Sequence, residues 1–307
     1  MRKYKNIFLI FILMISIFLT SCKTSSNTDI NVVCASYSEF DWARNISKGV
    51  ENINISYLTS SGISLHDYSL TIKDTVKIID SDIFIYVGGE SDIWCSEVIK
   101  NSKKSQISIS MLDTIETKLI EDNSDEDEYD EHVWLSIKNA KLIIKKICDA
   151  FVKIDNNHKE IYELNYNNYL NELENLDKNF KTTIENHIEN NQNLLVFSGR
   201  FPFKYLFNDY NLNYNAAFLG CSLDSSVNPN VIIELSNTVK ENNIKTLLKI
   251  EADQIDISSQ IKNISKLTLN ELTLNSMQIV KESDSKNISY IDVMKNNLEI
   301  IDKALNY

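Results

Sequence analysis

The stretch from Asp155 to Asn193 contains neither glycine nor proline, and apolar residues recur in it every three or four positions. This spacing puts the apolar side chains on one face of a single long helix. At about 1.5 Å per residue, such a helix would be roughly 40–50 Å long, which is more than one small domain needs. We therefore expect it to bridge two domains, although an ordinary long surface helix or a coiled-coil segment has the same spacing.

Short apolar runs alternate with helical patterns on both sides of this stretch. Ile30–Ala35 and Asp82–Val87 are examples before it, and Asn193–Phe197 and Thr246–Ile250 are examples after it. Alternation of this kind predicts an α/β fold with mainly parallel sheets. We expect two such lobes, joined by one long rigid helix, with a ligand cleft between them. The expected divisions are an N-terminal lobe at 30–154, the linking helix at 155–192 and a C-terminal lobe at 193–307.

The first residues have the pattern of an export signal. Arg2, Lys3 and Lys5 precede the apolar run Ile7–Leu19, which is too short for a comfortable transmembrane helix and typical of a signal peptide. The run ends in Leu-Thr-Ser-Cys22, which resembles a bacterial lipobox with a lipidated cysteine. We expect a signal peptide at 1–21, lipidation of Cys22 and a polar tether at 22–29. An uncleaved membrane anchor is the alternative, and both interpretations put the chain on the outer face of the cell membrane.

The charge of the chain limits its partners. The formal net charge is −12, and it becomes −15 when the three positive charges of residues 1–21 are removed. Such a surface repels nucleic acid and suits a cation. Besides Cys22, the cysteines lack the C-x-x-C spacing of zinc ribbons, so we interpret them as buried small apolar residues, with a disulfide left open. These cysteines are Cys34, Cys95, Cys148 and Cys221.

Several motifs, in the right order over nearly the whole chain, resemble those of one family. Leu65–Thr71 (LHDYSLT) resembles an L-H-x-Y-x-P-T motif, and Asp130–Ser136 (DEHVWLS) resembles a D-x-H-x-W-L motif. Both are typical of the cluster A-I zinc/manganese-binding lipoproteins of ABC importers. Phe197–Leu212, which contains Arg-Phe-Pro-Phe, and Phe218–Ser222 resemble a Gram-positive branch of that family. The resemblance implies a monomer that holds a divalent metal between two lobes and delivers it to a membrane permease.

His66 and His132 match the first two metal ligands of the family. Neutral imidazole is a ligand that zinc and manganese sites share. The other two histidines, His158 and His187, lie far apart along the predicted long helix, so they cannot meet one ion. We assign them to solvent.

The third ligand departs from the family pattern. Most members have His where this chain has Arg200, and arginine cannot coordinate a metal. Branch members with Arg there carry a late His, but this chain offers only Gln278, a weak zinc ligand. The resemblance leaves Glu251, after the strand Thr246–Ile250, and Asp224 as carboxylate ligands. Two His with carboxylates suit manganese better than a three-His zinc site does. Pairing of Arg200 with one of these carboxylates would instead weaken or abolish binding.

Two further acidic groups lie beside the motifs. Glu121–Glu131 holds eight carboxylates, which could gather cations loosely or form a solvated loop without a binding role. Glu90 and Asp92 follow a Gly-Gly turn, and we expect them to hold a histidine ring. Trp134 is expected to pack around the site.

Two other functions compete with metal import. Two His and a carboxylate also describe a metallohydrolase, but H-E-x-x-H, nucleophile-elbow and Walker motifs are missing from the sequence, so we do not expect an enzyme. A paralogous surface lipoprotein or adhesin with weakened or lost metal binding is the alternative that the missing third histidine leaves open. The sequence favours capture of Zn²⁺ or Mn²⁺ as a transported ligand.

Overall fold

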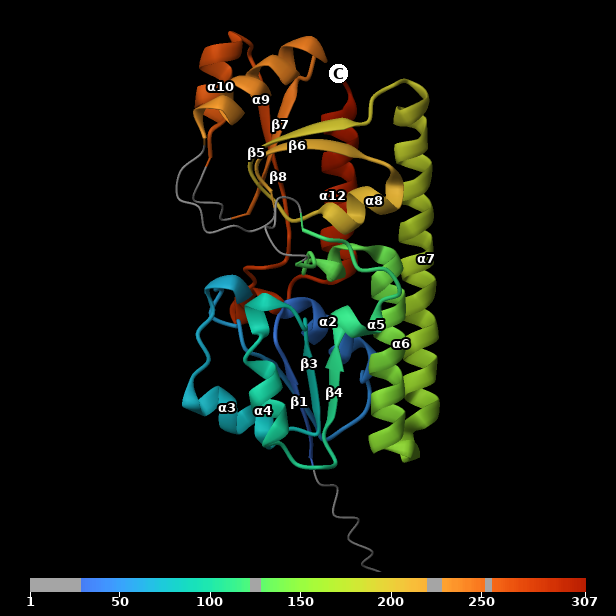
Figure 1. The fold of residues 1–307 in the computed structure, drawn as a ribbon. Helices are drawn as coiled ribbons and strands as arrows, with labels where there is room; N and C mark the ends of the chain where they lie inside the picture. Colours follow the sequence, from blue (N-terminus) through green and yellow to red (C-terminus); the bar gives the residue numbers. More distant parts are fainter. Residues whose placement is uncertain (1–28, 122–127, 220–227, 252–255) are drawn as a thin grey trace, which may run out of the picture.

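A computed structural model describes residues 29–121, 128–219, 228–251 and 256–307 (Figure 1). The predicted signal peptide, Cys22 and Asp224 lie outside the described residues, as does most of the acidic loop Glu121–Glu131. Within the described part of the chain, no helix has both the length and the apolar character needed to cross a membrane.

The N-terminal lobe contains a parallel four-stranded sheet of order β2-β1-β3-β4. Because side chains alternate along a strand, Val32 and Cys34 pack against α2 and α6 on one face, whereas Val33 packs against α3 and α4 on the other. The strands are β1 (Ile30–Cys34), β2 (Ile53–Tyr57), β3 (Ile83–Tyr86) and β4 (Ile107–Ser110), and the helices are α2 (Tyr37–Ile46), α3 (Ile72–Ile79), α4 (Cys95–Lys100), α5 (Met111–Thr114) and α6 (Ile137–Ile154).

The C-terminal lobe repeats this plan with the parallel strand order β6-β5-β7-β8. Val196 and Leu247 face α9 and α10, and the next residue of each strand faces the main core that includes α8 and α12. The strands are β5 (Leu194–Phe201), β6 (Asn213–Leu219), β7 (Thr246–Ile250) and β8 (Asn270–Leu274), and the helices are α8 (Lys204–Tyr210), α9 (Pro229–Glu241), α10 (Ser258–Ser265), α11 (Glu282–Ser285) and α12 (Tyr290–Leu305). The predicted α/β fold with two parallel sheets is confirmed.

The predicted long helix is also confirmed, as α7 (Lys159–Glu189), which runs beside both lobes (Figure 1). A short 3-10 turn joins it to α6, and Asp155 accepts hydrogen bonds there from His158 and Tyr162, at 2.6 and 2.9 Å. The assignment of both remaining histidines to solvent is wrong for His187. Its side chain is buried, and its Nε2 lies 2.7 Å from the carboxylate of Asp302 on α12. The exact lobe boundaries stay a prediction.

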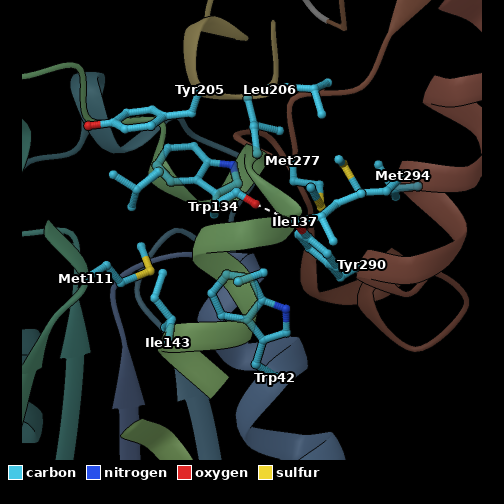
Figure 2. Packing of buried hydrophobic residues seen from close by; sticks show 14 of the residues in the cluster. Trp42, Met111, Trp134, Ile137, Ile143, Tyr205, Leu206, Met277, Tyr290 and Met294 are labelled. Carbon is cyan, nitrogen blue, oxygen red and sulfur yellow. Dashed lines mark hydrogen bonds between the residues drawn. The ribbon is translucent and has the colours of Figure 1, made fainter. Parts of the chain in front are cut away.

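The chain crosses back to the N-terminal lobe after β8. We call Ser276–Tyr290 the C-terminal strap. Its backbone carbonyls accept hydrogen bonds from N-terminal side chains, among them Tyr57 to Val280 at 2.9 Å and Arg44 to Ser285 at 2.5 Å. Figure 2 shows the strap residue Met277 near Trp134 and Leu206 in one buried cluster. The two lobes are therefore connected by a continuous core as well as by α7.

Three cysteines of the described chain are free and buried: Cys34, Cys95 and Cys148. Burial raises the pKa of the Cys34 thiol, which keeps it neutral and unreactive. Their interpretation as small core residues is confirmed, whereas Cys221 lies outside the described residues.

Candidate metal centre

The structure brings His66 and His132 together. His66 lies in a 3-10 turn (Leu65–Asp67) after β2, and His132 immediately precedes another (Val133–Leu135) that leads into α6. Their Nε2 atoms are 3.3 Å apart. Two nitrogens bound to one tetrahedral zinc ion at about 2.0–2.1 Å lie about 3.3 Å apart. The spacing of the two imidazoles therefore fits two ligands of a single ion.

The opposite nitrogen of each ring has its own partner. Ser91 Oγ lies 2.6 Å from His66 Nδ1, and Asp130 Oδ1 lies 3.2 Å from His132 Nδ1. Asp130 also accepts the backbone N–H of His132, at 2.9 Å. The Asp130 carboxylate can only accept, so it favours a proton on Nδ1 of His132 and leaves the lone pair of that ring on Nε2. The Ser91 hydroxyl, which can donate to or accept from Nδ1 of His66, holds that ring with its Nε2 facing His132.

Two buried carboxylates place negative charge beside the imidazoles of His66 and His132. Asp130 and Glu131 are 1% and 7% exposed. Glu131 accepts the backbone N–H of Ser91 at 2.8 Å, and its other oxygen lies 3.9 Å from Nδ1 of His66. Negative charge at this distance from an imidazole attracts a cation to the site.

Glu251 lies in the C-terminal lobe directly after β7. Its carboxylate accepts two hydrogen bonds from Ser276, and burial raises its pKa. The carbonyl of Ser276 accepts from Trp134 Nε1 at 2.9 Å, and the Trp134 ring packs against His132 with centroids 5.3 Å apart. Glu251 is thus connected to the imidazole pair through Ser276 and Trp134, and its role as a ligand stays a prediction.

Comparison with known proteins identifies the family of this chain. The family described as "Zinc-uptake complex component A periplasmic" (ZnuA) matches residues 32–304. The chain belongs to the ZnuA family. This confirms the family resemblance inferred from the histidine motifs, and the description is that of a component of an uptake system.

Relatives of this ZnuA-family chain match it over nearly its whole length. The high-affinity zinc uptake system protein ZnuA of Bacillus subtilis is 26% identical, over 99% of this chain and 98% of that protein. The manganese ABC transporter substrate-binding lipoprotein PsaA of Streptococcus mitis is 24% identical, over 99% of each chain. The Zn(II)-bound ZnuA-like domain of Streptococcus pneumoniae AdcA has the same fold, with a TM-score of 0.73 at 24% identity, over 91% of this chain and all of that chain.

The C-terminal side of the candidate site in this ZnuA-family chain differs from the N-terminal side. Arg200 is half-buried near the end of β5, just after a register shift, and Gln278 accepts a hydrogen bond from Ser64 at 3.3 Å. In the parts of the chain that the structure describes, no three His, Cys, Asp or Glu side chains gather in a metal-binding group. The roles of Arg200, Gln278 and Asp224 stay predictions.

The Gly-Gly turn after β3 does not hold a histidine ring with Glu90 and Asp92, as we expected from the sequence. Asp92 accepts the backbone N–H groups of Val87, Gly88 and Gly89, at 2.7, 2.9 and 3.0 Å. Burial raises the pKa of Asp92 to about 7. Glu90 is exposed, and the hydroxyl from this turn that reaches His66 is that of Ser91. Asp92 therefore shapes the turn, and Ser91 orients the ring.

Sequence reasoning missed three residues of the site: Ser91, Asp130 and Glu131. The two acids directly precede His132, so their position in the motif was a usable signal. For Ser91 the sequence holds no comparable signal, because only the fold brings its 3-10 turn (Glu90–Asp92) against the turn that carries His66.

Proposed function

We propose that this chain is the extracytoplasmic metal-binding subunit of an ABC importer, which captures Zn²⁺ or Mn²⁺ between its lobes and delivers it to the permease. The observation that carries the proposal is the 3.3 Å separation of the Nε2 atoms of His66 and His132. The printed functions of the zinc- and manganese-transport relatives support it.

In this proposal the two imidazoles bind the ion, and Ser91 and Asp130 keep their Nε2 lone pairs directed at it. Glu251 and Asp224 would complete the coordination from the C-terminal side. A carboxylate next to two imidazoles is a donor set that accepts both zinc and manganese. Arg200 and Gln278 would act from the edge of the site.

The proposed location follows from the N-terminal sequence. After removal of residues 1–21, a lipid on Cys22 would anchor the chain to the outer face of the membrane, with 22–29 as a tether. Relatives that carry the name substrate-binding lipoprotein support this location. The chain would act there as a monomer beside its permease.

Metal titration of the chelator-stripped domain, residues 23–307, tests the proposal. Calorimetry with Zn²⁺ and Mn²⁺ should give one site with a dissociation constant well below about 1 μM, and His66→Ala and His132→Ala should each weaken it at least about 100-fold. His158→Ala, which removes an imidazole far from the pair, is the matched control. Binding no tighter than about 1 μM would reject import and favour a surface lipoprotein that has lost its metal.

A further inference from the structure

The ligand His132 follows a pair of antiparallel segments, 119–121 and 128–130, and we call this pair the hairpin. Residues on its two sides pair across an antiparallel bridge between Ile120 and Tyr129, and Asp130 donates its backbone N–H to the carbonyl of Leu119 at 2.8 Å. Asp130 in turn contacts both the backbone and the ring of His132. Leu119 is therefore linked to the ring of His132 through a single residue, Asp130.

Helix α8 of the other lobe contacts this hairpin with two side chains. The Tyr205 hydroxyl accepts the backbone N–H of Leu119 at 3.0 Å, and Lys204 Nζ donates to the carbonyl of Ile120 at 2.5 Å. Tyr205 is 3% exposed, and burial raises the pKa of its hydroxyl to about 12, so it stays neutral at physiological pH. Both contacts hold the hairpin strand that pairs with Asp130.

A cavity of about 70 Å³ lies beside these contacts. It is lined by Leu119 and Tyr205, by Asn139 on α6 and by Asp209 on α8. Leu119 also packs against the buried core that joins the two lobes. The two hydrogen bonds from α8 tie the backbone of this segment to the C-terminal lobe.

We propose that Tyr205 and Lys204 are positioning residues that fix His132 through the hairpin, so that metal affinity depends on the contact of α8 with the N-terminal lobe. The proposal rests on the proposed metal-binding function. It gives a route by which separation of the lobes would displace one of the two imidazoles and release the ion.

Tyr205→Phe tests this, because it removes only the hydroxyl that accepts from Leu119. Tyr210→Phe is the matched control, since Tyr210 lies on the same helix and its hydroxyl donates to Asp177 on α7, at 2.6 Å. The chain has four histidines, so their ring signals can be followed individually by NMR in the metal-free protein. Tyr205→Phe should shift the His132 signal and leave those of His158 and His187 in place.

Metal affinity, measured by competition with a chelator for Zn²⁺, should fall about tenfold in Tyr205→Phe, further in Tyr205→Phe with Lys204→Met, and not in Tyr210→Phe. An unchanged His132 signal would overturn the proposal, whether or not the chain binds metal. A shifted signal with unchanged affinity would overturn the coupling to the metal. If the wild-type chain binds no metal but Tyr205→Phe still shifts the His132 signal, the proposed function is rejected. The positioning of His132 by Tyr205 is then still supported.

Discussion

Glu251 accepts two hydrogen bonds from one residue, Ser276, from its backbone N–H and from its hydroxyl, each at 2.7 Å. Ser276 is fully buried at the start of the C-terminal strap, and its carbonyl accepts from Trp134 beside His132. The carboxylate therefore orders the strap where it approaches the imidazole pair, whether or not it also coordinates the metal.

Glu251→Gln should destabilise the metal-free protein. Its amide has one acceptor oxygen where the carboxylate has two, so the Ser276 hydroxyl must turn to accept from the amide nitrogen, and two hydrogen bonds to a carboxylate become weaker neutral ones, at a cost of about 1 kcal/mol. Urea unfolding followed by circular dichroism measures this change. Glu234→Gln on the exposed side of α9 is the control and should leave the free energy of unfolding unchanged. Equal stability of the two variants would contradict the conclusion that Glu251 orders the C-terminal strap.

Ser91→Ala and Asp130→Asn should lower zinc affinity without removing a ligand. Partners of the non-coordinating imidazole nitrogen fix its tautomer, and their loss typically costs 10–100-fold in metal affinity. Calorimetry on the variants measures this loss. Ser96→Ala is the control for Ser91, because Ser96 is exposed and its hydroxyl donates to the carbonyl of Ile93. Wild-type affinity in both variants would show that the rings are oriented by other contacts.

Much of this architecture could be predicted because it has a local sequence signal. The strands alternate with helices, and the apolar stripe of α7 is periodic, so both sheets and the long helix were recognisable. His66 and His132 stood in motifs. In physical terms, these features depend on neighbours in the sequence or on a short repeating pattern.

Other features could not be predicted, because they depend on where distant segments meet. Tyr57 donates to the carbonyl of Val280, a backbone acceptor that every residue offers, so the sequence gives no sign that the strap crosses to the other lobe. The burial of His187 depends on Asp302, on another helix. Whether Ser91 or Asp92 faces His66 is decided by the geometry of one 3-10 turn.

The metal-free protein should lose stability as the pH rises from about 4 to 7. Burial raises the pKa of Asp92 from 3.8 to about 7 and raises the pKa values of Glu39 and Asp41. A raised carboxyl pKa means that the folded state binds the proton more tightly than the unfolded state does. Proton binding therefore stabilises the fold fully at a pH below the carboxyl pKa of the unfolded chain. This contribution to the free energy of unfolding disappears as the pH rises through the folded-state pKa.

Urea unfolding at pH 5, 6, 7 and 8 measures how the free energy of unfolding changes with pH. In Asp92→Asn this change should be smaller than in the wild type. Carboxylates with lowered pKa, such as Asp256, change charge below about pH 4 and do not contribute in this window. A free energy of unfolding that rose between pH 5 and 7 would contradict the raised pKa of Asp92 in the folded state.

Tyr290→Phe should weaken both the fold and the metal site. The Tyr290 hydroxyl donates to the carbonyl of Trp134 at 2.8 Å inside the core that joins the lobes (Figure 2), and Trp134 packs against His132. Loss of this hydrogen bond should cost about 1–2 kcal/mol in unfolding free energy. Tyr162→Phe is the matched control, because Tyr162 is equally buried but donates to Asp155, away from the site. Both variants should lose similar stability, whereas only Tyr290→Phe should lose zinc affinity in a chelator competition. Equal affinities would mean that the Trp134 carbonyl does not influence the position of His132.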